Sequence, residues 1–310
     1  MAVTTERKAA AATAGQRRPL LKRGLSFEGR MLAPALLILA LLSIFPFVYI
    51  VIMSFSSVRL IGGISFDWAG LDNWTRLFSD SAVGASWLRS IVFFVLSVGL
   101  QMTLGIAIAL AIYETRRGRN IIVSLVLMPM FMAPVIVGLL GRFLTDSTYG
   151  LYAWALDAIG LYNGDILGSP TSAFVAVTLM DVWEWTPLIA LIVLAGLTSM
   201  PKQVLEAAAI DGASYWSRLR DIVLPMISGV IIVALLIRSM DAIRYFDIIT
   251  NTTNGGPADA TKIVPIRLYE TAFRFFDLGY AAAIGLSMLA VTIVMANLFM
   301  NILKRRGLAR

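Results

Sequence analysis

The chain has 310 residues, of which 58% are hydrophobic and only 15% are charged, and its mean hydropathy is +0.80. Soluble domains carry a larger charged fraction, so this composition indicates an integral membrane protein. The chain has no Cys and no His, which excludes disulfides, thiol nucleophiles, His-based catalysis and Cys/His zinc sites. We therefore predict no metal site and no catalytic residue.

Six apolar segments are long enough to cross a bilayer, which requires about 20 mostly apolar residues each. They are residues 32–53, 91–113, 121–140, 172–197, 226–249 and 279–303. The sequence therefore predicts an all-α membrane protein with six transmembrane helices. In this division residues 1–30 form an amino-terminal tail, residues 31–303 form the transmembrane domain and residues 304–310 form a second tail.

Two of these spans contain prolines or polar residues that a plain apolar helix lacks. In the third, Pro129 and Pro134 each remove a backbone donor, which fits either a broken helix lining a path or a simple kink. In the second, Ser97 and Gln101 lie four residues apart and could hydrogen-bond another helix, although packing is the more common role of such residues.

Lys and Arg residues gather in alternate loops. Seventeen of the 26 lie in the two tails and in the loops after the second and fourth spans, whereas the loops between them carry mostly Asp. Because cytoplasmic loops are enriched in Lys and Arg, we expect both termini and the loop after the fourth span to be cytoplasmic. The net charge of +7 follows from this bias and from contact with anionic lipid headgroups, and we predict no nucleic-acid partner.

The loop after the fourth span is the most informative polar stretch, and residues 206–225 read EAAAIDGASYWSRLRDIVLP. Pro201 suits the first turn of a short helix, Ser199 is placed to cap that helix, and Gly212 is placed to end it in a left-handed conformation. The alanines at 207–209 make the helix thin, so the groove of another protein can approach its backbone closely.

This loop resembles the EAA loop of bacterial ATP-binding-cassette (ABC) importer permeases. The matching residues are Glu206, Ala207, Ala208, Asp211, Gly212, Ala213, Leu219, Ile222, Leu224 and Pro225, while Ser228 stands where many relatives have proline. Residues 70–74, 181–187, 238–247, 254–257 and 278–283 are similar to the carbohydrate branch of that superfamily, which includes the larger maltose-transporter permease and the glycerol-3-phosphate permease.

The resemblance implies a type I ABC importer permease fold, with a cytoplasmic EAA coupling helix between the fourth and fifth transmembrane helices. It implies a bacterial cytoplasmic-membrane complex with a second permease, two copies of an ABC ATPase that hold ATP and Mg, and an external solute-binding protein. The solute would be a sugar or sugar derivative. The residues assigned to coupling with the ATPase are Glu206, Ala207, Ala208, Asp211, Gly212, Leu224 and Pro225.

Polar residues within the spans are candidates for the solute path, because an unpaired charge costs about 2.5–3.5 kcal/mol at the bilayer centre. Asp181, Glu184 and Trp185 share one face of the fourth span, and Tyr245 lies in the fifth. A carboxylate beside an aromatic ring suits a sugar, which offers hydroxyls to bond and a C–H face to stack. A packing role for these four residues is the alternative.

Four charged residues of the fifth span form two pairs spaced i, i+3, Arg238 with Asp241 and Arg244 with Asp247. We interpret these as structural ion pairs that neutralise each other inside the bundle. On this reading, removal of the Asp241 charge leaves Arg238 without a partner and impairs assembly.

The alternative to an ABC permease is a secondary transporter. A self-sufficient carrier driven by an ion gradient would use embedded carboxylates such as Asp181 and Glu184 as ion sites. The chain shows no six-span internal repeat, and such a carrier has no need of a helix–turn–helix presented to the cytoplasm. The absence of G-x-x-x-x-G-K-[ST] indicates that nucleotide is bound by a partner, so we predict a non-enzymatic permease subunit.

Overall fold

A computed structural model describes residues 27–59 and 65–305, and the chain divides into two units, residues 1–49 and 50–310. Helix α1 (Phe27–Ser54) spans the division and begins inside the segment predicted as a tail. The rest of that tail, residues 1–26, lies outside the described residues, as do residues 306–310 of the second tail.

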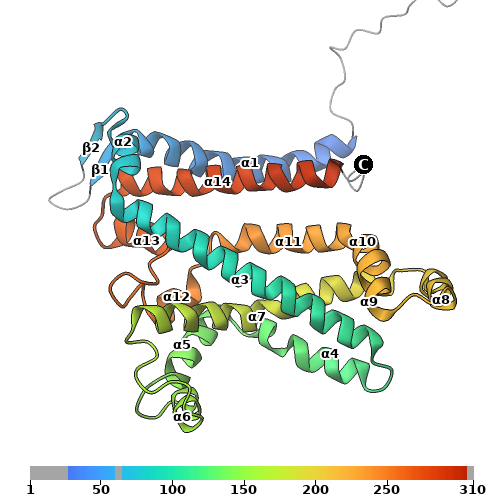
Figure 1. Ribbon diagram of the computed structural model, residues 1–310. Coiled ribbons are helices and arrows are strands. Elements are labelled where there is room, and N and C mark those ends of the chain that lie inside the picture. Colours follow the sequence, from blue (N-terminus) through green and yellow to red (C-terminus); the bar gives the residue numbers. More distant parts are fainter. Residues whose placement is uncertain (1–26, 60–64, 306–310) are drawn as a thin grey trace, which may run out of the picture. The chain divides into compact units, whose positions relative to one another are not determined.

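The second unit is helical apart from one short hairpin (Figure 1). The strands are β1 (Ser56–Arg59) and β2 (Ser65–Trp68), and the helices are α2 (Asp72–Ser79), α3 (Ser81–Glu114), α4 (Arg119–Leu127), η1 (Met128–Phe131), α5 (Pro134–Leu144), α6 (Leu151–Ala158), α7 (Pro170–Thr198), α8 (Lys202–Ile210), α9 (Tyr215–Ser217), η2 (Arg218–Val223), α10 (Leu224–Met226), α11 (Ser228–Ala242), α12 (Asp247–Thr252), α13 (Val264–Phe273) and α14 (Leu278–Arg305).

Four helices in the described part of the chain are long and apolar enough to cross a membrane, namely Met31–Ser54, Ser81–Glu114, Pro170–Thr198 and Leu278–Lys304. Two further pairs pass the same test together, Arg119–Phe131 with Pro134–Leu144 and Tyr215–Met226 with Ser228–Ala242. They are bent by 91° and 64°, and counting each pair as one span gives the six that the sequence predicts. The antiparallel hairpin β1–β2 is an addition that the apolar pattern did not predict.

The break in the third span has a direct cause in its prolines. Ala133, which precedes Pro134, has an extended backbone with ψ of 136°, because the proline ring disfavours a helical conformation for the preceding residue. Pro134 then occupies the start of α5, where its missing N–H costs nothing. The chain therefore turns sharply here rather than kinking gently.

The fifth span ends earlier than predicted. Helix α11 stops at Ala242, and Phe246 has a non-helical backbone with φ of −139° before α12 begins. The residues after α11 belong to an apolar cluster. In this cluster Tyr245, Ile248 and Ile249 pack with Phe93 of α3 and other buried side chains. The predicted continuous helix over residues 226–249 is therefore wrong at both ends, since Ile227 also interrupts it.

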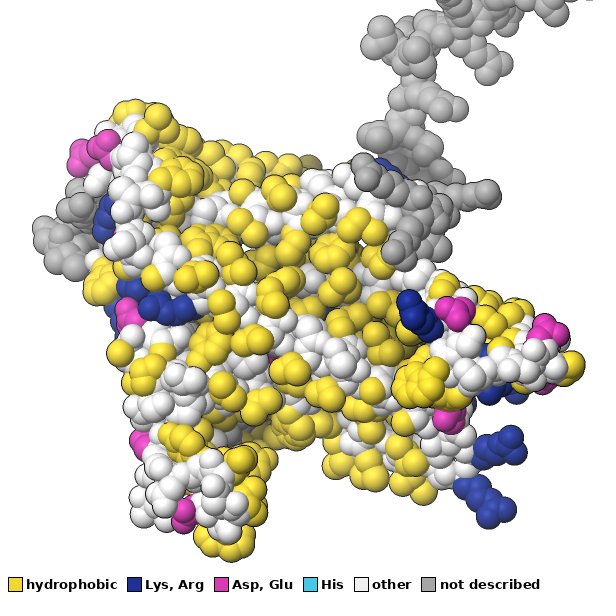
Figure 2. Space-filling view, in the orientation of Figure 1, with side chains coloured by type: hydrophobic (Ala, Val, Ile, Leu, Met, Phe, Trp, Pro, Cys, Tyr) yellow, Lys and Arg dark blue, Asp and Glu magenta, His cyan; other side chains and the backbone are white. Residues whose placement is uncertain are grey.

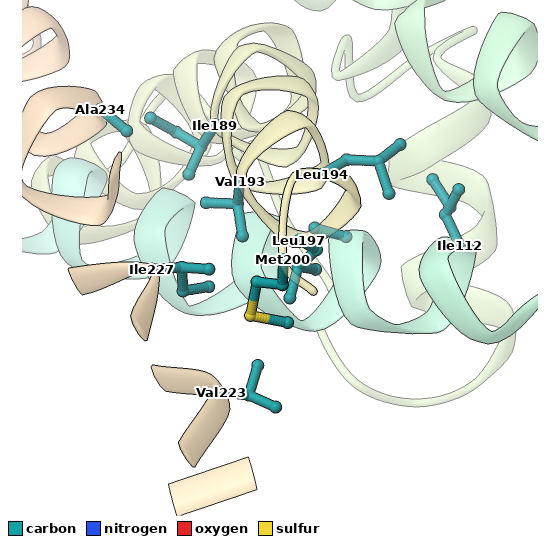
Figure 3. Packing of buried hydrophobic residues seen from close by; sticks show 10 residues of the cluster. Ile112, Ile189, Val193, Leu194, Leu197, Met200, Val223, Ile227 and Ala234 are labelled. Carbon is teal, nitrogen blue, oxygen red and sulfur yellow. The ribbon is translucent and has the colours of Figure 1, made fainter. Parts of the chain in front are cut away.

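Helices α3 and α7 pack side by side along much of their length (Figure 1). Gly105 allows this approach, because a Cβ there would meet Ile189 at 2.7 Å. An apolar cluster at this contact, which we call the lower core, joins α3 and α7 to α11 and to the loop that precedes it. Its buried members are Ala109, Ile112, Ile189, Val193, Leu194, Leu197, Met200, Val223, Ile227 and Ala234. Figure 3 shows Leu197 and Met200 beside Ile227 in this lower core.

Candidate functional site

The loop between α7 and α11 begins with a helix whose start differs from the sequence prediction. Pro201 is the residue before α8, and no side chain caps the helix. The hydroxyl of Ser199 instead donates to the carbonyl of Gly196, 2.8 Å away in the preceding helix. Ser199 therefore closes α7 rather than opening α8.

The carboxyl end of α8 matches the prediction. Gly212 has φ of +79°, a left-handed conformation that glycine adopts without steric cost. The N–H of Ala213 donates to the carbonyl of Ala208 at 3.0 Å, and the N–H of Gly212 donates to that of Ala209 at 3.2 Å. These two bonds form a Schellman motif, which satisfies the last carbonyls of the helix and turns the chain back.

The outer side of this loop forms an exposed surface, which we call the loop face. It includes the predicted coupling residues Glu206, Ala207 and Asp211, whereas Ala208 is buried and faces its own chain. Two apolar residues that the sequence analysis did not single out are also prominent, since Ile210 is 87% exposed and Trp216 is 73% exposed. The sequence signal for these two residues was their position as isolated apolar residues in a polar loop. Large exposed apolar side chains mark contact surfaces.

Behind the loop face, the loop is anchored in the transmembrane bundle. Leu205 of α8 and Leu219 of η2 pack against the lower core, and Val223 is one of its members. Leu224 and Pro225, both predicted coupling residues, lie in the short α10 that returns the chain to α11. Leu205 and Leu219 therefore connect α8 and η2 to the packed side chains of α7 and α3.

A second polar feature lies at mid-bundle, where α3, α7 and α11 meet. The fully buried guanidinium of Arg238 contacts Asp181 at 2.5 Å, Asp241 at 2.6 Å and the side-chain carbonyl oxygen of Gln101 at 2.7 Å. Ser97 and Gln101 also donate to the carboxylate of Asp181, from α3 to α7. We call these five residues the charge cluster.

The charge cluster joins residues that the sequence analysis had placed in separate groups. The Arg238–Asp241 pair is present, but Arg238 also neutralises Asp181, which was predicted to line the solute path. Asp181 is fully buried, whereas the side chain of Asp241 is 47% exposed. Asp181 is therefore enclosed between helices, and Asp241 is the partly exposed carboxylate of the charge cluster.

The other predicted path residues lie against the charge cluster. The hydroxyl of Tyr245 donates to Glu184 at 3.3 Å, and both residues are buried. The Arg238 guanidinium lies 5.4 Å from the ring centroid of Trp185 and 5.6 Å from that of Tyr245, which are cation–π distances. The four predicted residues are thus brought together, with only Trp185 partly exposed.

The predicted Arg244–Asp247 ion pair does not form among the residues that the structure describes. The Nε of Arg244 instead donates to the carbonyl of Met240 at 3.2 Å. The i, i+3 spacing brings two side chains together only on a continuous helix. The backbone leaves the helix between these two residues, so that spacing no longer applies.

Side chains on the visible face of the molecule follow a membrane pattern. Figure 2 shows hydrophobic side chains across the middle of α3 and α11, with charged side chains mainly toward the ends of the helices. This distribution fits a bundle surrounded by hydrocarbon at mid-height and by polar groups at its ends.

Comparison with known proteins identifies the family. The family described as binding-protein-dependent transport system inner membrane component matches residues 101–307. The trehalose/maltose transport system permease protein MalF of Thermococcus litoralis is 35% identical over 84% of this chain and 89% of its own length. The sn-glycerol-3-phosphate transport system permease protein UgpA of Yersinia pseudotuberculosis is 31% identical over 79% of this chain and 83% of its own length.

Solved structures share the fold. A chain of a bacterial ABC transporter involved in the import of the acidic polysaccharide alginate aligns with a TM-score of 0.77 at 23% identity, over 89% of this chain and 94% of that one. These relatives give no support to a self-sufficient, ion-driven carrier. The chain belongs to the family of binding-protein-dependent transport system inner membrane components and is a permease subunit of an ABC importer.

Proposed function

We propose that this permease carries a sugar or sugar derivative and forms half of the translocation path. The main support is the similarity to permeases named for trehalose/maltose, trehalose, sulfoquinovosyl glycerol and glycerol-3-phosphate transport. On this proposal a second permease supplies the other half of the path, and an external solute-binding protein delivers the solute.

The ATPase is proposed to bind the loop face. Ala207 and Ala209 leave the backbone of α8 accessible, Ile210 supplies an apolar anchor, and Glu206 and Asp211 supply charge at the edges. Two ATPase copies would serve the two permeases and would hold ATP and Mg, since this chain has no phosphate-binding loop. The contacts of Leu205, Leu219 and Val223 would then carry ATPase closure into the spans.

The topology proposed for the chain follows from its charges. Both termini and the loop face are placed in the cytoplasm, because most of the Lys and Arg residues lie in those segments. The hairpin β1–β2, helices α2 and α6, and the segment from α12 to α13 are then external.

The solute path is proposed to run along the exposed side of α11. Val233, Ile237 and Asp241 lie at i, i+4 and i+8, so they share one face that no other part of the described chain covers fully. A carboxylate at membrane depth faces the bundle interior or water rather than hydrocarbon, which supports the placement of Asp241 beside an aqueous path. Trp185 would add an aromatic surface, while Asp181 and Tyr245 contact the guanidinium of Arg238 and Glu184 accepts a hydrogen bond from Tyr245.

The division of labour with an ATPase is directly testable. The purified chain alone is expected neither to bind nor to hydrolyse ATP. Solute uptake into proteoliposomes should require the second permease, the ATPase and the binding protein together, and it should respond to sugars rather than to amino acids. ATP turnover by the isolated chain, or uptake driven by an ion gradient without ATP, would contradict the proposal.

Replacement of Asp241 by asparagine tests the path. Assembly should stay near the wild-type level because Arg238 keeps Asp181 as its partner. The sequence alone predicted impaired assembly for this variant. Loss of a charged hydrogen bond to the solute, worth about 1.5–3 kcal/mol, should raise the half-saturating sugar concentration about tenfold or more. Radiolabelled uptake and size-exclusion chromatography measure the two effects.

Asp247→Asn is the matched control, because it makes the same charge change on α12, beyond the end of α11. It should leave uptake unchanged. An Asp241→Asn variant that fails to assemble would return this residue to a purely structural role.

A further inference from the structure

A cavity of about 640 Å³ lies between α5, α6 and the first half of α7. Its walls include Val137, Leu144, Leu156, Ile166, Leu179 and Trp183. This volume falls in the range of ordinary ligand pockets, about 300–1,000 Å³. It is separate from both the loop face and the charge cluster, none of whose residues lines it.

Three hydroxyl groups of the wall are already bonded within the chain, while Tyr152 and Trp183 contribute one further polar group each. The hydroxyl of Thr145 donates to the carbonyl of Gly141 at 2.7 Å, and that of Ser172 donates to Ile166 at 2.6 Å. The hydroxyl of Tyr162 donates to the carbonyl of Asp165 at 3.3 Å. No charged side chain of the described residues lines the cavity. A sugar would lose most of its hydrogen bonds to water here, so the cavity suits a hydrocarbon chain.

Helix α6, which forms one wall, exposes large apolar side chains and has a single charged residue, Asp157. Leu151, Tyr152 and Trp154 are each more than half exposed, and Ile159 just beyond the helix is 72% exposed. Large apolar side chains exposed together on one short helix indicate contact with apolar surroundings. Tyr and Trp favour the boundary between lipid headgroups and hydrocarbon, which places α6 and the cavity mouth at that level.

The chain around the cavity is acidic. Residues 145–169 contain Asp146, Asp157 and Asp165 and no Lys or Arg, and the nearest cation in the sequence is Arg142 of α5. The carboxylate of Asp146 accepts a hydrogen bond from the backbone N–H of Thr148 at 2.8 Å, and that bond lowers the pKa of Asp146 below its usual value. The excess of acidic residues in this segment repels anionic headgroups and attracts cationic ones.

We infer that this cavity binds one acyl chain of a phospholipid whose ethanolamine headgroup places its ammonium beside the three carboxylates. The apolar wall selects the chain, and the acidic segment selects the headgroup over that of phosphatidylglycerol. The bound lipid fills the space between α5 and α7 and thereby supports the bend in the third span.

Native mass spectrometry of the purified, assembled transporter tests the site. The wild type should retain phosphatidylethanolamine, and Ala155→Trp should lose it because Ala155 lines the cavity. Ala158→Trp, on the same helix but outside the cavity wall, should retain the lipid. Leu179→Trp fills the same space from α7 and replaces Ala155→Trp if that variant does not assemble.

The headgroup preference is measured by adding back lipids to the delipidated transporter. The wild type should bind phosphatidylethanolamine about tenfold more tightly than phosphatidylglycerol, as expected for a charged hydrogen bond. Replacing all three aspartates by asparagine keeps the oxygen acceptors of the turns and should abolish that preference. The inference is overturned if the wild type retains no lipid, if Ala155→Trp retains it, or if a photo-crosslinker at Leu156 captures the second permease instead.

Discussion

Replacing Arg238 with methionine is expected to prevent assembly of the transporter. The change leaves Asp181 as an uncompensated charge in a fully buried position between α3 and α7. Breaking a buried ion pair by removing one partner costs about 3–5 kcal/mol, a large part of the stability of an ordinary domain. Fluorescence-detected size-exclusion chromatography after a thermal ramp should show little or no folded complex.

The double variant Arg238→Met with Asp181→Leu separates charge burial from a general loss of packing. Removing both charges in favour of apolar residues of similar size is often neutral, so assembly should recover substantially. Folded Arg238→Met at wild-type yield would show that the charge cluster does not support the bundle. If the double variant also fails to assemble, the buried polar groups of Ser97 and Gln101 lack hydrogen-bond partners once both charges are removed.

Replacing Gly212 with valine is expected to uncouple ATP hydrolysis from uptake. A β-branched residue at φ of +79° carries strain of about 1–3 kcal/mol. An added Cβ meets nothing within 4 Å, so the strain comes from the backbone alone and should displace α8 without unfolding the bundle. Uptake in proteoliposomes should fall while the chain still assembles and the binding protein still binds its solute.

Gly118→Val is the matched control for this prediction. Gly118 has φ of +73°, and an added Cβ there also meets nothing within 4 Å, but it lies in the loop between α3 and α4. The two variants therefore introduce equal backbone strain in different loops. Equal losses of uptake in both would contradict a special role for α8.

Features of the fold that depend on local chemistry could be predicted from the sequence. The apolar runs gave the spans, and the loop chemistry gave the left-handed end of α8 at Gly212. Pro129 and Pro134 predicted an interruption, but not its size, because the angle depends on what α5 packs against. The end of α11 could not be predicted, since Tyr245, Ile248 and Ile249 leave the helical path to fill a cluster built by distant segments.

Contacts between polar residues were also predictable only within a single helix. Spacing along one helix predicted the Arg238–Asp241 contact, but it also predicted an Arg244–Asp247 contact that does not form. The contact between Arg238 and Asp181 joins different helices, and a single sequence carries no signal for such a pairing. The roles proposed for the loop face and the path remain predictions until the variants are measured.

The charge cluster also bears on the order in which the chain enters the membrane. Gln101 and Asp181, on α3 and α7, are synthesised before Arg238 on α11. Helix α11 has only 15 residues and carries two charges, so it is a poor candidate for independent insertion. The contacts of Arg238 with Gln101 and Asp181 therefore tie this late, short helix to helices that enter the membrane before it.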